Sequence, residues 1–210
     1  MKFPKIFHLP HSPGVTNDDK VIESIDVFKG KSLIFTEKMD GENTCMERDS
    51  IHARSENSKD HPSRHLIKSV HAGIRQFIPA HIAIYGENLF AKHSIAYEGL
   101  PEEGFLVFAV INKYTNEFLS WSEVEDWARK LSFQTVPILA LTGNAIYHDM
   151  PRGWTSHYSR EIEGYVVRNT QRFKVDEINQ NMAKWVRANH VQTDEHWSKK
   201  WTPNGRKSEY

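Results

Sequence analysis

Short apolar runs separated by turn-forming residues predict a chain rich in β-strands. The segments predicted as strands are Leu33–Glu37, Thr44–Arg48, Ile51–Arg54, Ile82–Tyr85, Phe105–Ile111, Tyr165–Arg168 and Lys184–Arg187. Apolar residues at 66, 67, 70, 74 and 77 follow the helical period instead, which predicts a helix over His65–Phe77. A second helix is predicted over Glu123–Leu131, capped by Ser122 and Glu125. Strands and helices do not alternate regularly, so we expect an α+β fold rather than a doubly wound sheet.

Composition places the chain among ordinary globular proteins. Its 210 residues fit one domain, and 27 basic residues balance 27 acidic ones, so net charge does not indicate a polyanionic partner. The longest apolar run, Phe105–Ile111, is far shorter than the ~20 residues that cross a bilayer. The N-terminus lacks the apolar core of a signal peptide, and the single cysteine, Cys45, excludes an intrachain disulfide. We expect a soluble, monomeric, cytoplasmic protein with no membrane association.

The C-terminal region allows two interpretations. From Lys184 onward, basic residues are interleaved with Trp185, Trp197 and Trp201. Aromatic rings beside cations are the surface that single-stranded nucleic acid uses. A helical tail over residues 188–210 that packs its tryptophans on the core would give the same pattern.

The segment from Glu37 to Asn43 places Lys38 and Asp40 two residues apart, followed by Gly41. In an extended chain, residues two apart project to the same face, and glycine allows a sharp turn. Asp-Gly between two strands is also a common hairpin signal. Taken alone, the segment favours a hairpin over a reactive site.

Three further segments border predicted strands and carry a charge or an aromatic ring. They are Ile84–Glu87, Phe105–Phe108 and Glu163–Arg168. Each alone is typical of a core strand with a solvated charge. Their order along the chain, however, resembles the motif order of the covalent nucleotidyltransferases. The matching series is K-x-D-G, apolar-G-E, an aromatic strand, E-G-apolar-apolar-apolar-basic and a late lysine. This superfamily contains ATP-dependent DNA and RNA ligases and mRNA capping enzymes.

The matching positions run from Lys38 to Arg187. Lys38–Gly41 resembles motif I of that superfamily, and Arg54 resembles motif Ia. The remaining matches are Glu87 in motif III, Phe108 in motif IIIa, Glu163 in motif IV and Lys184 in motif V. The longer stretches HLPHSPGVTNDD, GENLFAKHSIAY and AKWVRANHVQTDEHW resemble small RNA ligases.

The resemblance implies a single nucleotidyltransferase domain over residues 1–210, with mainly antiparallel sheets flanked by helices and the nucleotide bound between them. It further implies an ATP-dependent RNA ligase that uses Mg²⁺ or Mn²⁺ and joins 5′-phosphate to 3′-hydroxyl ends, as in RNA repair. The implied catalytic residues are Lys38, Asp40, Glu87, Glu163 and Lys184. The implied nucleotide contacts are Glu37, Lys38, Arg54, Glu87, Phe108, Glu163, Arg168, Lys184 and Arg187. The implied metal ligands are Asp40, Glu87 and Glu163.

This chemistry requires Lys38 to attack as a neutral amine. Neutrality at pH 7 costs about 4.6 kcal/mol for an ordinary lysine. We expect nearby cations, Lys184, Arg168 and the metal ion, to lower the pKa of Lys38 and to stabilise charge on the α-phosphate. Carboxylates are suitable Mg²⁺ ligands, directly or through water.

Two positions depart from the usual pattern. Motif V of many relatives has two lysines two residues apart, whereas Lys184 and Arg187 are three apart, so either could meet the α-phosphate. Motif IV often ends in lysine, but here it ends in Arg168.

Three alternatives to the RNA ligase remain open. DNA ligases and capping enzymes carry an OB-fold domain after motif V, for which the 23 residues after Arg187 are too few. This disfavours a DNA ligase and a GTP-using capping enzyme. If the protein is an RNA ligase, a partner could supply a further RNA-binding domain. The third alternative is a non-catalytic nucleic-acid-binding module.

Overall fold

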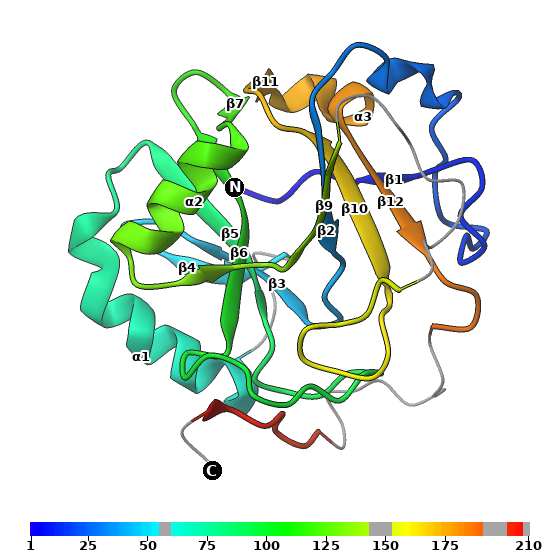
Figure 1. Ribbon diagram of the computed structural model, residues 1–210. Helices are drawn as coiled ribbons and strands as arrows, with labels where there is room; N and C mark the ends of the chain where they lie inside the picture. The colour runs from blue at the N-terminus through cyan, green and yellow to red at the C-terminus, as the bar shows by residue number, and fades with distance from the viewer. Residues whose placement is uncertain (55–59, 143–152, 191–200, 208–210) are drawn as a thin grey trace.

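Two β-sheets form the centre of the protein, and helices cover the outer side of one of them (Figure 1). The computed structural model describes residues 1–54, 60–142, 153–190 and 201–207. Within these residues all strand pairings are antiparallel except β1 with β12 and β6 with β8. The expected α+β fold with mainly antiparallel sheets is confirmed.

The first sheet has five strands in the order β1-β12-β10-β2-β9. Their bounds are Phe7–His8 for β1, Leu33–Glu37 for β2, Ile138–Thr142 for β9, Gly164–Asn169 for β10 and Met182–Val186 for β12. The sequence pattern predicted β2, β10 and, less accurately, β12, but not β1 or β9.

The second sheet has seven strands. Its main path is β11-β7-β6-β5-β3-β4, with β8 paired beside β6. The bounds are Glu42–Met46 for β3, Ile51–Ala53 for β4, Ile82–Asn88 for β5, Phe105–Asn112 for β6, Glu117–Phe118 for β7, Gln134–Thr135 for β8 and Phe173–Lys174 for β11. Strands β5 and β6 are apolar along most of their length because side chains from both of their faces are buried.

The helices pack on the second sheet or join strands. The α-helices are α1 (His65–Ile74), α2 (Trp121–Lys130) and α3 (Ile178–Asn181), and the 3₁₀-helices are η1 (Ile25–Phe28), η2 (Pro62–Arg64), η3 (Arg75–Phe77) and η4 (Val175–Glu177). Apolar residues of α1 and α2 share one core with β5 and β6.

The predicted cap of the second helix is wrong by two residues. Glu123, not Glu125, accepts the backbone N–H of the capping residue, which is Ser120 (3.0 Å). The sequence contains both S-x-x-E frames, 120–123 and 122–125. The frame that is used places Trp121 in the first turn of the helix, where it is buried against the second sheet with Val124.

Side-chain alternation lets the first sheet serve both a core and a pocket. Tyr165 and Val167 of β10 lie in the core beneath η1, together with Trp185 of β12. Val166 and Lys184 face the other way and line a pocket between the sheets. Because successive side chains of a strand point to opposite faces, the apolar positions fix which residues reach the pocket.

The C-terminal region is only partly described. Trp185 is buried and stacked on Tyr165, as the packing interpretation requires, and Trp201 contacts the rings of His61 and Phe90. Trp197 lies outside the described residues. Of the tail 188–210, residues 188–190 and 201–207 contain no α-helix. The helical tail was therefore a wrong prediction for these residues. None of the helices in the described ranges has the length and apolar character needed to cross a membrane.

Candidate active site

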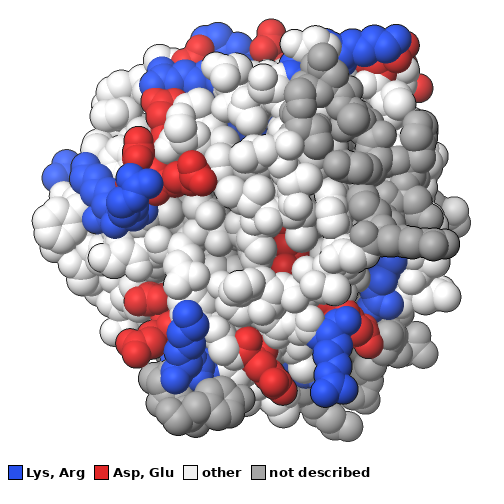
Figure 2. Space-filling view, in the orientation of Figure 1, with Lys and Arg blue, Asp and Glu red and all other residues white. Residues whose placement is uncertain are grey.

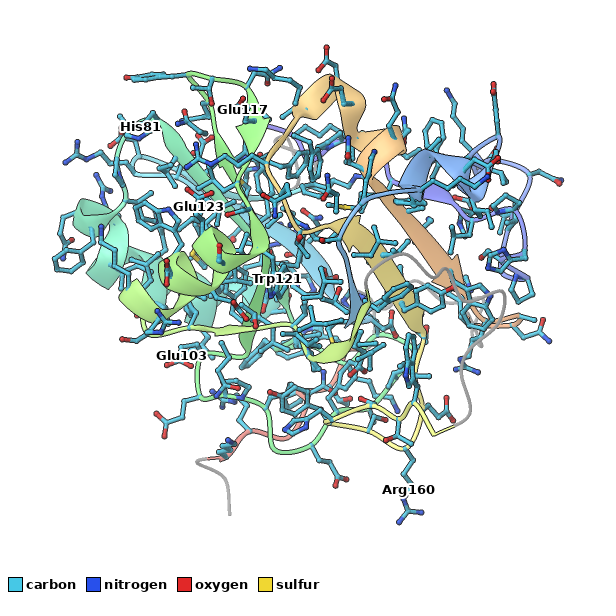
Figure 3. The ribbon with its side chains drawn as sticks, turned by 45° about the horizontal axis from the view of Figure 1, so that its top comes forward. His81, Glu103, Glu117, Trp121, Glu123 and Arg160 are labelled. Atoms are coloured by element: carbon cyan, nitrogen blue, oxygen red, sulfur yellow. The ribbon has the colours of Figure 1, made fainter. Side chains whose placement is uncertain are left out.

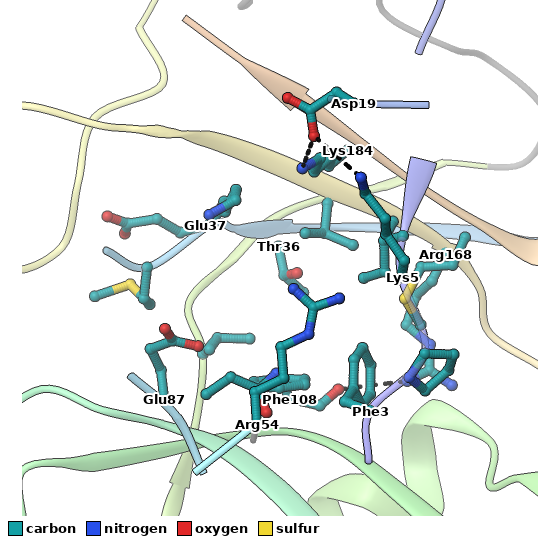
Figure 4. A pocket seen from close by; sticks show the side chains of 18 residues that line it. Phe3, Lys5, Asp19, Thr36, Glu37, Arg54, Glu87, Phe108, Arg168 and Lys184 are labelled. Carbon is teal, nitrogen blue, oxygen red and sulfur yellow. Dashed lines mark hydrogen bonds and ion pairs between the residues drawn. The ribbon is translucent and has the colours of Figure 1, made fainter. Parts of the chain in front are cut away.

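A pocket of about 380 Å³ lies between the two sheets and is lined by residues from both of them (Figure 4). Seven sequence-predicted nucleotide contacts line it: Glu37, Lys38, Arg54, Glu87, Phe108, Arg168 and Lys184. Asp40, Glu163 and Arg187 are not among the lining residues. These seven side chains are up to 147 positions apart in the chain, from Glu37 to Lys184.

Lys38 lies where the chain crosses from one sheet to the other. Strands β2 and β3, which flank the Lys38–Gly41 segment, belong to different sheets and do not pair, so the hairpin alternative is wrong. The backbone N–H of Lys38 donates to the carbonyl of Gly164 (3.0 Å). A Cβ atom at Gly41 would lie 2.8 Å from the carbonyl oxygen of Asn88. Glycine is thus required for the close approach to β5.

Acidic groups dominate the surroundings of Lys38. Its Nζ lies 2.7 and 2.8 Å from the two carboxylate oxygens of Glu163. Burial is the largest single influence and opposes the charged amine, but Glu163, Glu87 and Asp40 together outweigh it, so the pKa of Lys38 is raised. The sequence-based expectation of a lowered pKa is therefore wrong for the protein without ligands. The amine is charged at pH 7 and must lose its proton when the ligands bind.

Glu87 is an acid held in an unfavourable place for charge. Burial, followed by the nearby Glu163 and Asp40 carboxylates, raises the pKa of Glu87 to about 8, although Lys38 opposes the shift. A cation bound beside Glu87 and Glu163 would offset this crowding of negative charge, and carboxylate oxygens are hard donors that suit Mg²⁺ or Mn²⁺. The donor chemistry of these two residues fits a divalent ion.

Asp40 is held by backbone groups and by a tyrosine hydroxyl. Its Oδ2 accepts the backbone N–H groups of Ser94 (2.7 Å) and Ile95 (2.8 Å), and its own N–H donates to the hydroxyl of Tyr97 (2.8 Å). In the ranges that the structure describes, no three His, Cys, Asp or Glu side chains lie close enough to share a metal ion. The structure therefore does not bring Asp40, Glu87 and Glu163 together as direct ligands. Asp40 instead anchors the motif I loop.

Phe108 and Arg54 reach the pocket from the second sheet. Phe108 of β6 and Val166 of β10 line it from the two sheets. Arg54 follows β4, is fixed by a bond from its backbone N–H to the carbonyl of Asn43 (2.9 Å), and extends into the pocket (Figure 4). A flat base can lie between an aromatic ring and an apolar side chain in such a site.

Lys184 and Arg187 are clearly separated. Lys184 lines the pocket, and its Nζ lies 3.5 Å from Asp19. Arg187 instead forms an ion pair with Glu161 (2.8 Å). Of the two motif V candidates, only Lys184 has its side chain at the pocket.

Arg168 forms part of the pocket wall, but its guanidinium is bound to the protein itself. It donates to the backbone carbonyls of Leu119 (2.9 Å) and Phe108 (3.4 Å) and lies over the ring of Trp121. Trp121, labelled in Figure 3, lies in the first turn of α2 and is itself buried. Only 1% of Arg168 is exposed, and burial lowers its pKa to about 10. These bonds give Arg168 a structural role at the pocket wall.

Sequence reasoning missed the contribution of the N-terminal segment. Phe3, Pro4, Lys5, Ile6 and Asp19 all line the pocket. The local signal for this segment was the stretch HLPHSPGVTNDD, which ends at Asp19. The contact itself depends on the pairing of β1 with β12, about 175 residues away in the chain.

A family comparison covers most of the chain. The model of the RNA ligase family matches residues 31–186. The chain belongs to the RNA ligase family. No curated protein sequence matches the chain.

Among solved structures, this RNA ligase family member is similar to the RNA ligase of Naegleria gruberi. The form with PPi has a TM-score of 0.60 and 20% identity, over 89% of this chain and 57% of that one. The E227A mutant with ATP and Mn has a TM-score of 0.58 and 18% identity, over 90% and 58%. The E312A mutant with AMP and Mn has a TM-score of 0.60 and 15% identity, over 89% and 56%. The likeness shows the fold. The chain spans less than two thirds of the length of these ligases.

Proposed function

We propose that the chain is an ATP-dependent RNA ligase that carries AMP on Lys38 and transfers it to a 5′-phosphate end of RNA. The observation that supports this most is the position of Lys38 at the junction of the two sheets. There its amine contacts Glu163 and borders a pocket that holds Glu87, Phe108 and Lys184. The Naegleria gruberi ligase, which has the same fold, has been solved with ATP, AMP and Mn.

In the first step the neutral Nζ of Lys38 attacks the α-phosphorus of ATP. A P–N bond forms, the bond between the α-phosphorus and the oxygen bridging to the β-phosphate breaks, and its electron pair leaves on pyrophosphate. Glu163, 2.7 Å from Nζ, accepts the proton that the nitrogen loses. Lys184 stabilises negative charge on the α-phosphate.

The other residues bind and orient the nucleotide. Phe108 and Val166 hold the adenine between the sheets, Glu37 lies beside them at the end of β2, and Arg54 contacts the ribose or the incoming 5′-phosphate. Glu87 and Glu163 would hold the divalent ion, directly or through water, and this ion supplies positive charge that neutralises the phosphates.

The second and third steps use the same site. The 5′-phosphate of RNA displaces Lys38 from AMP, and a 3′-hydroxyl then attacks the activated end and releases AMP. On the face drawn in Figure 2, positive and negative side chains are interspersed outside the grey atoms rather than gathered by sign. Because basic and acidic residues also balance over the whole sequence, we expect weak, salt-sensitive RNA binding, to which a partner could add further RNA contacts. The monomeric state and the single-domain organisation remain predictions.

The central experiment is covalent labelling. The protein is incubated with α-labelled ATP or GTP and magnesium, and is then analysed on a denaturing gel and by mass spectrometry. We expect an AMP adduct on Lys38 that disappears in Lys38→Ala and persists in Lys29→Ala, a change at an exposed lysine outside the pocket. Labelling by GTP alone would identify a capping-type enzyme. RNA binding without any labelling would identify a non-catalytic module.

Substrate choice needs a separate assay. Sealing of nicked duplex RNA, single-stranded RNA and matched DNA substrates distinguishes an RNA ligase from a DNA ligase. We expect the RNA substrates to be joined faster. Faster joining of DNA by the labelled protein would refute the RNA assignment and leave the covalent intermediate intact.

A further inference from the structure

The segment before residue 31 closes one side of the pocket, although it lies outside the part of the chain that matches the RNA ligase family. It is held firmly in place. The ring of Phe3 packs edge-on against Phe108 (centroids 5.2 Å apart), and the hydroxyl of Tyr85 donates to the carbonyl of Met1 (2.7 Å). Lys5 is thereby carried to the pocket wall. The proposed function assigns no role to this lysine.

Lys5 and Lys184 face the same carboxylate. The Oδ1 of Asp19 lies 3.5 Å from Nζ of Lys184 and 4.0 Å from Nζ of Lys5 (Figure 4). Both distances exceed the usual length of an N–H···O hydrogen bond. An ammonium has three N–H donors, so each lysine keeps donor capacity for a second anion beside its contact with Asp19. Lys5 also donates to the carbonyl of Asp18 (2.5 Å), which fixes the direction of its side chain.

Asp19 is kept in place by other partners. Its Oδ2 accepts bonds from the hydroxyl (2.8 Å) and the N–H (3.2 Å) of Thr16 and lies 3.4 Å from Nε2 of His8. Burial raises the pKa of Asp19, but the Thr16 bonds and the charge of Lys184 outweigh it and lower the pKa to about 2. Burial, aided by Lys184, lowers the pKa of His8 to about 4, so this ring is neutral at pH 7. Two positive charges thus share one negative charge, and the cluster stays net positive.

The two lysines differ in their position relative to the nucleophile. Lys184 is close enough to Lys38 for their charges to interact. Of its side chain 20% is exposed, against 41% for Lys5, so Lys5 lies nearer the solvent. In an in-line displacement the leaving group is opposite the attacking atom. A polyphosphate that runs from an α-phosphate at Lys184 toward solvent would meet Lys5 next.

We propose that Lys5 binds the pyrophosphate portion of ATP and stabilises the pyrophosphate as it leaves, with Asp19 positioning Lys5 beside Lys184. This inference rests on the proposed function. No proton moves to or from Lys5. Its ammonium neutralises the electron pair that the broken bond leaves on the β-phosphate oxygen. The retained AMP keeps its contacts with Lys184 and Phe108.

A binding experiment tests the proposal without turnover. In the Lys38→Ala background the nucleotide binds but no AMP is transferred, so calorimetry with magnesium reports affinities directly. Adding Lys5→Ala should raise the Kd of ATP about tenfold and leave the Kd of AMP unchanged, because AMP has no β- or γ-phosphate. Lys2→Ala, an exposed lysine of the same segment, is the matched control. Equal losses for ATP and AMP, or no loss for ATP, would overturn the proposal.

Kinetics add a second, independent readout. Lys5→Ala should slow formation of lysyl-AMP from ATP and should need more pyrophosphate to drive the reverse reaction. It should nevertheless join pre-adenylated RNA at the wild-type rate, since that substrate bypasses the first step. Lys5→Arg keeps the charge and should restore adenylation. A variant that loses both activities with a lowered melting temperature has a structural defect, which contradicts the proposal.

Different results would refute the proposed function and the role of Lys5. If the wild-type protein takes up no AMP, the proposed function falls, and the role of Lys5 falls with it. If the wild type is labelled normally and Lys5→Ala matches it in labelling, pyrophosphate dependence and ATP affinity, only the role of Lys5 is refuted.

Discussion

Arg168 provides a sharp test of whether a motif position has kept its family role. We predict that Arg168→Met destabilises the fold and leaves nucleotide affinity nearly unchanged. Methionine preserves much of the buried length of the side chain but removes the donors that serve the carbonyls of Leu119 and Phe108. If Arg168 bound phosphate instead, the same substitution would lower the nucleotide affinity and change the stability little.

The size of the effect follows from the contacts. The 2.9 Å bond to Leu119 is well formed, and losing a charged donor to a buried carbonyl costs about 1.5–3 kcal/mol. The longer bond to Phe108 and the ring contact with Trp121 add about 1 kcal/mol. Removing the buried charge offsets part of this loss of stability, because burial disfavours the charged guanidinium and lowers its pKa. We expect a net loss of about 2–3 kcal/mol, or roughly 4–12 °C in Tm for a protein of this size.

Thermal denaturation measures the loss of stability, and calorimetric titration with ATP well below the melting temperature measures affinity. Arg172→Met is the control, because Arg172 forms a surface pair with Glu123 that is expected to contribute less than about 1 kcal/mol. A structural role for Arg168 is refuted if Arg168→Met melts like the wild type while its ATP affinity falls tenfold or more.

Three further predictions concern other parts of the site. Gly164→Ala should impair folding, measured as a loss of soluble protein or of Tm, because an added Cβ would lie 2.0 Å from the carbonyl oxygen of Trp185. Glu37→Gln should gain stability relative to the wild type as pH rises from 5 to 8. Burial raises the pKa of Glu37 from 4.5 to about 7, so the native wild type binds more protons than the unfolded chain in this window. The free energy of unfolding of the wild type therefore falls by up to about 3 kcal/mol between pH 5 and pH 8. Denaturant titrations at several pH values measure this fall. Asn204→Ala should lower the free energy of unfolding by about 2–4 kcal/mol, because the Asn204 amide accepts from the N–H of Tyr97 (2.9 Å) and donates to the carbonyl of Leu89 (2.8 Å). It should also slow lysyl-AMP formation, because Tyr97 belongs to the segment that anchors Asp40.

Each of these has a contrary outcome. An unchanged Tm in Gly164→Ala would mean that β10 and β12 can separate at no cost. A pH-independent difference between Glu37→Gln and the wild type would show that Glu37 is charged throughout the range. Loss of stability in Asn204→Ala with full adenylation would separate the C-terminal segment from the anchoring of Asp40.

Local pattern was sufficient for much of the fold. The strand Leu33–Glu37 was predicted with the bounds observed, and His65–Phe77 corresponds to α1 followed by η3. These elements depend on apolar periods that a short window contains. Strand β9 was missed because its partly exposed apolar residues at the sheet edge give no clear alternation.

The sequence alone determined which residue types this site has to work with: a lysine before Asp-Gly, carboxylates beside glycines, an aromatic strand and a late lysine. Only the tertiary structure decided what they face. Lys38 meets Glu163 from 125 positions away, Arg168 turns into the interior, and Lys5 joins Lys184 across Asp19. The physical reason is that strand pairing and burial fix the direction of a side chain, and both depend on segments that are distant in the chain. Charge and pKa are set by those neighbours and not by the residue itself.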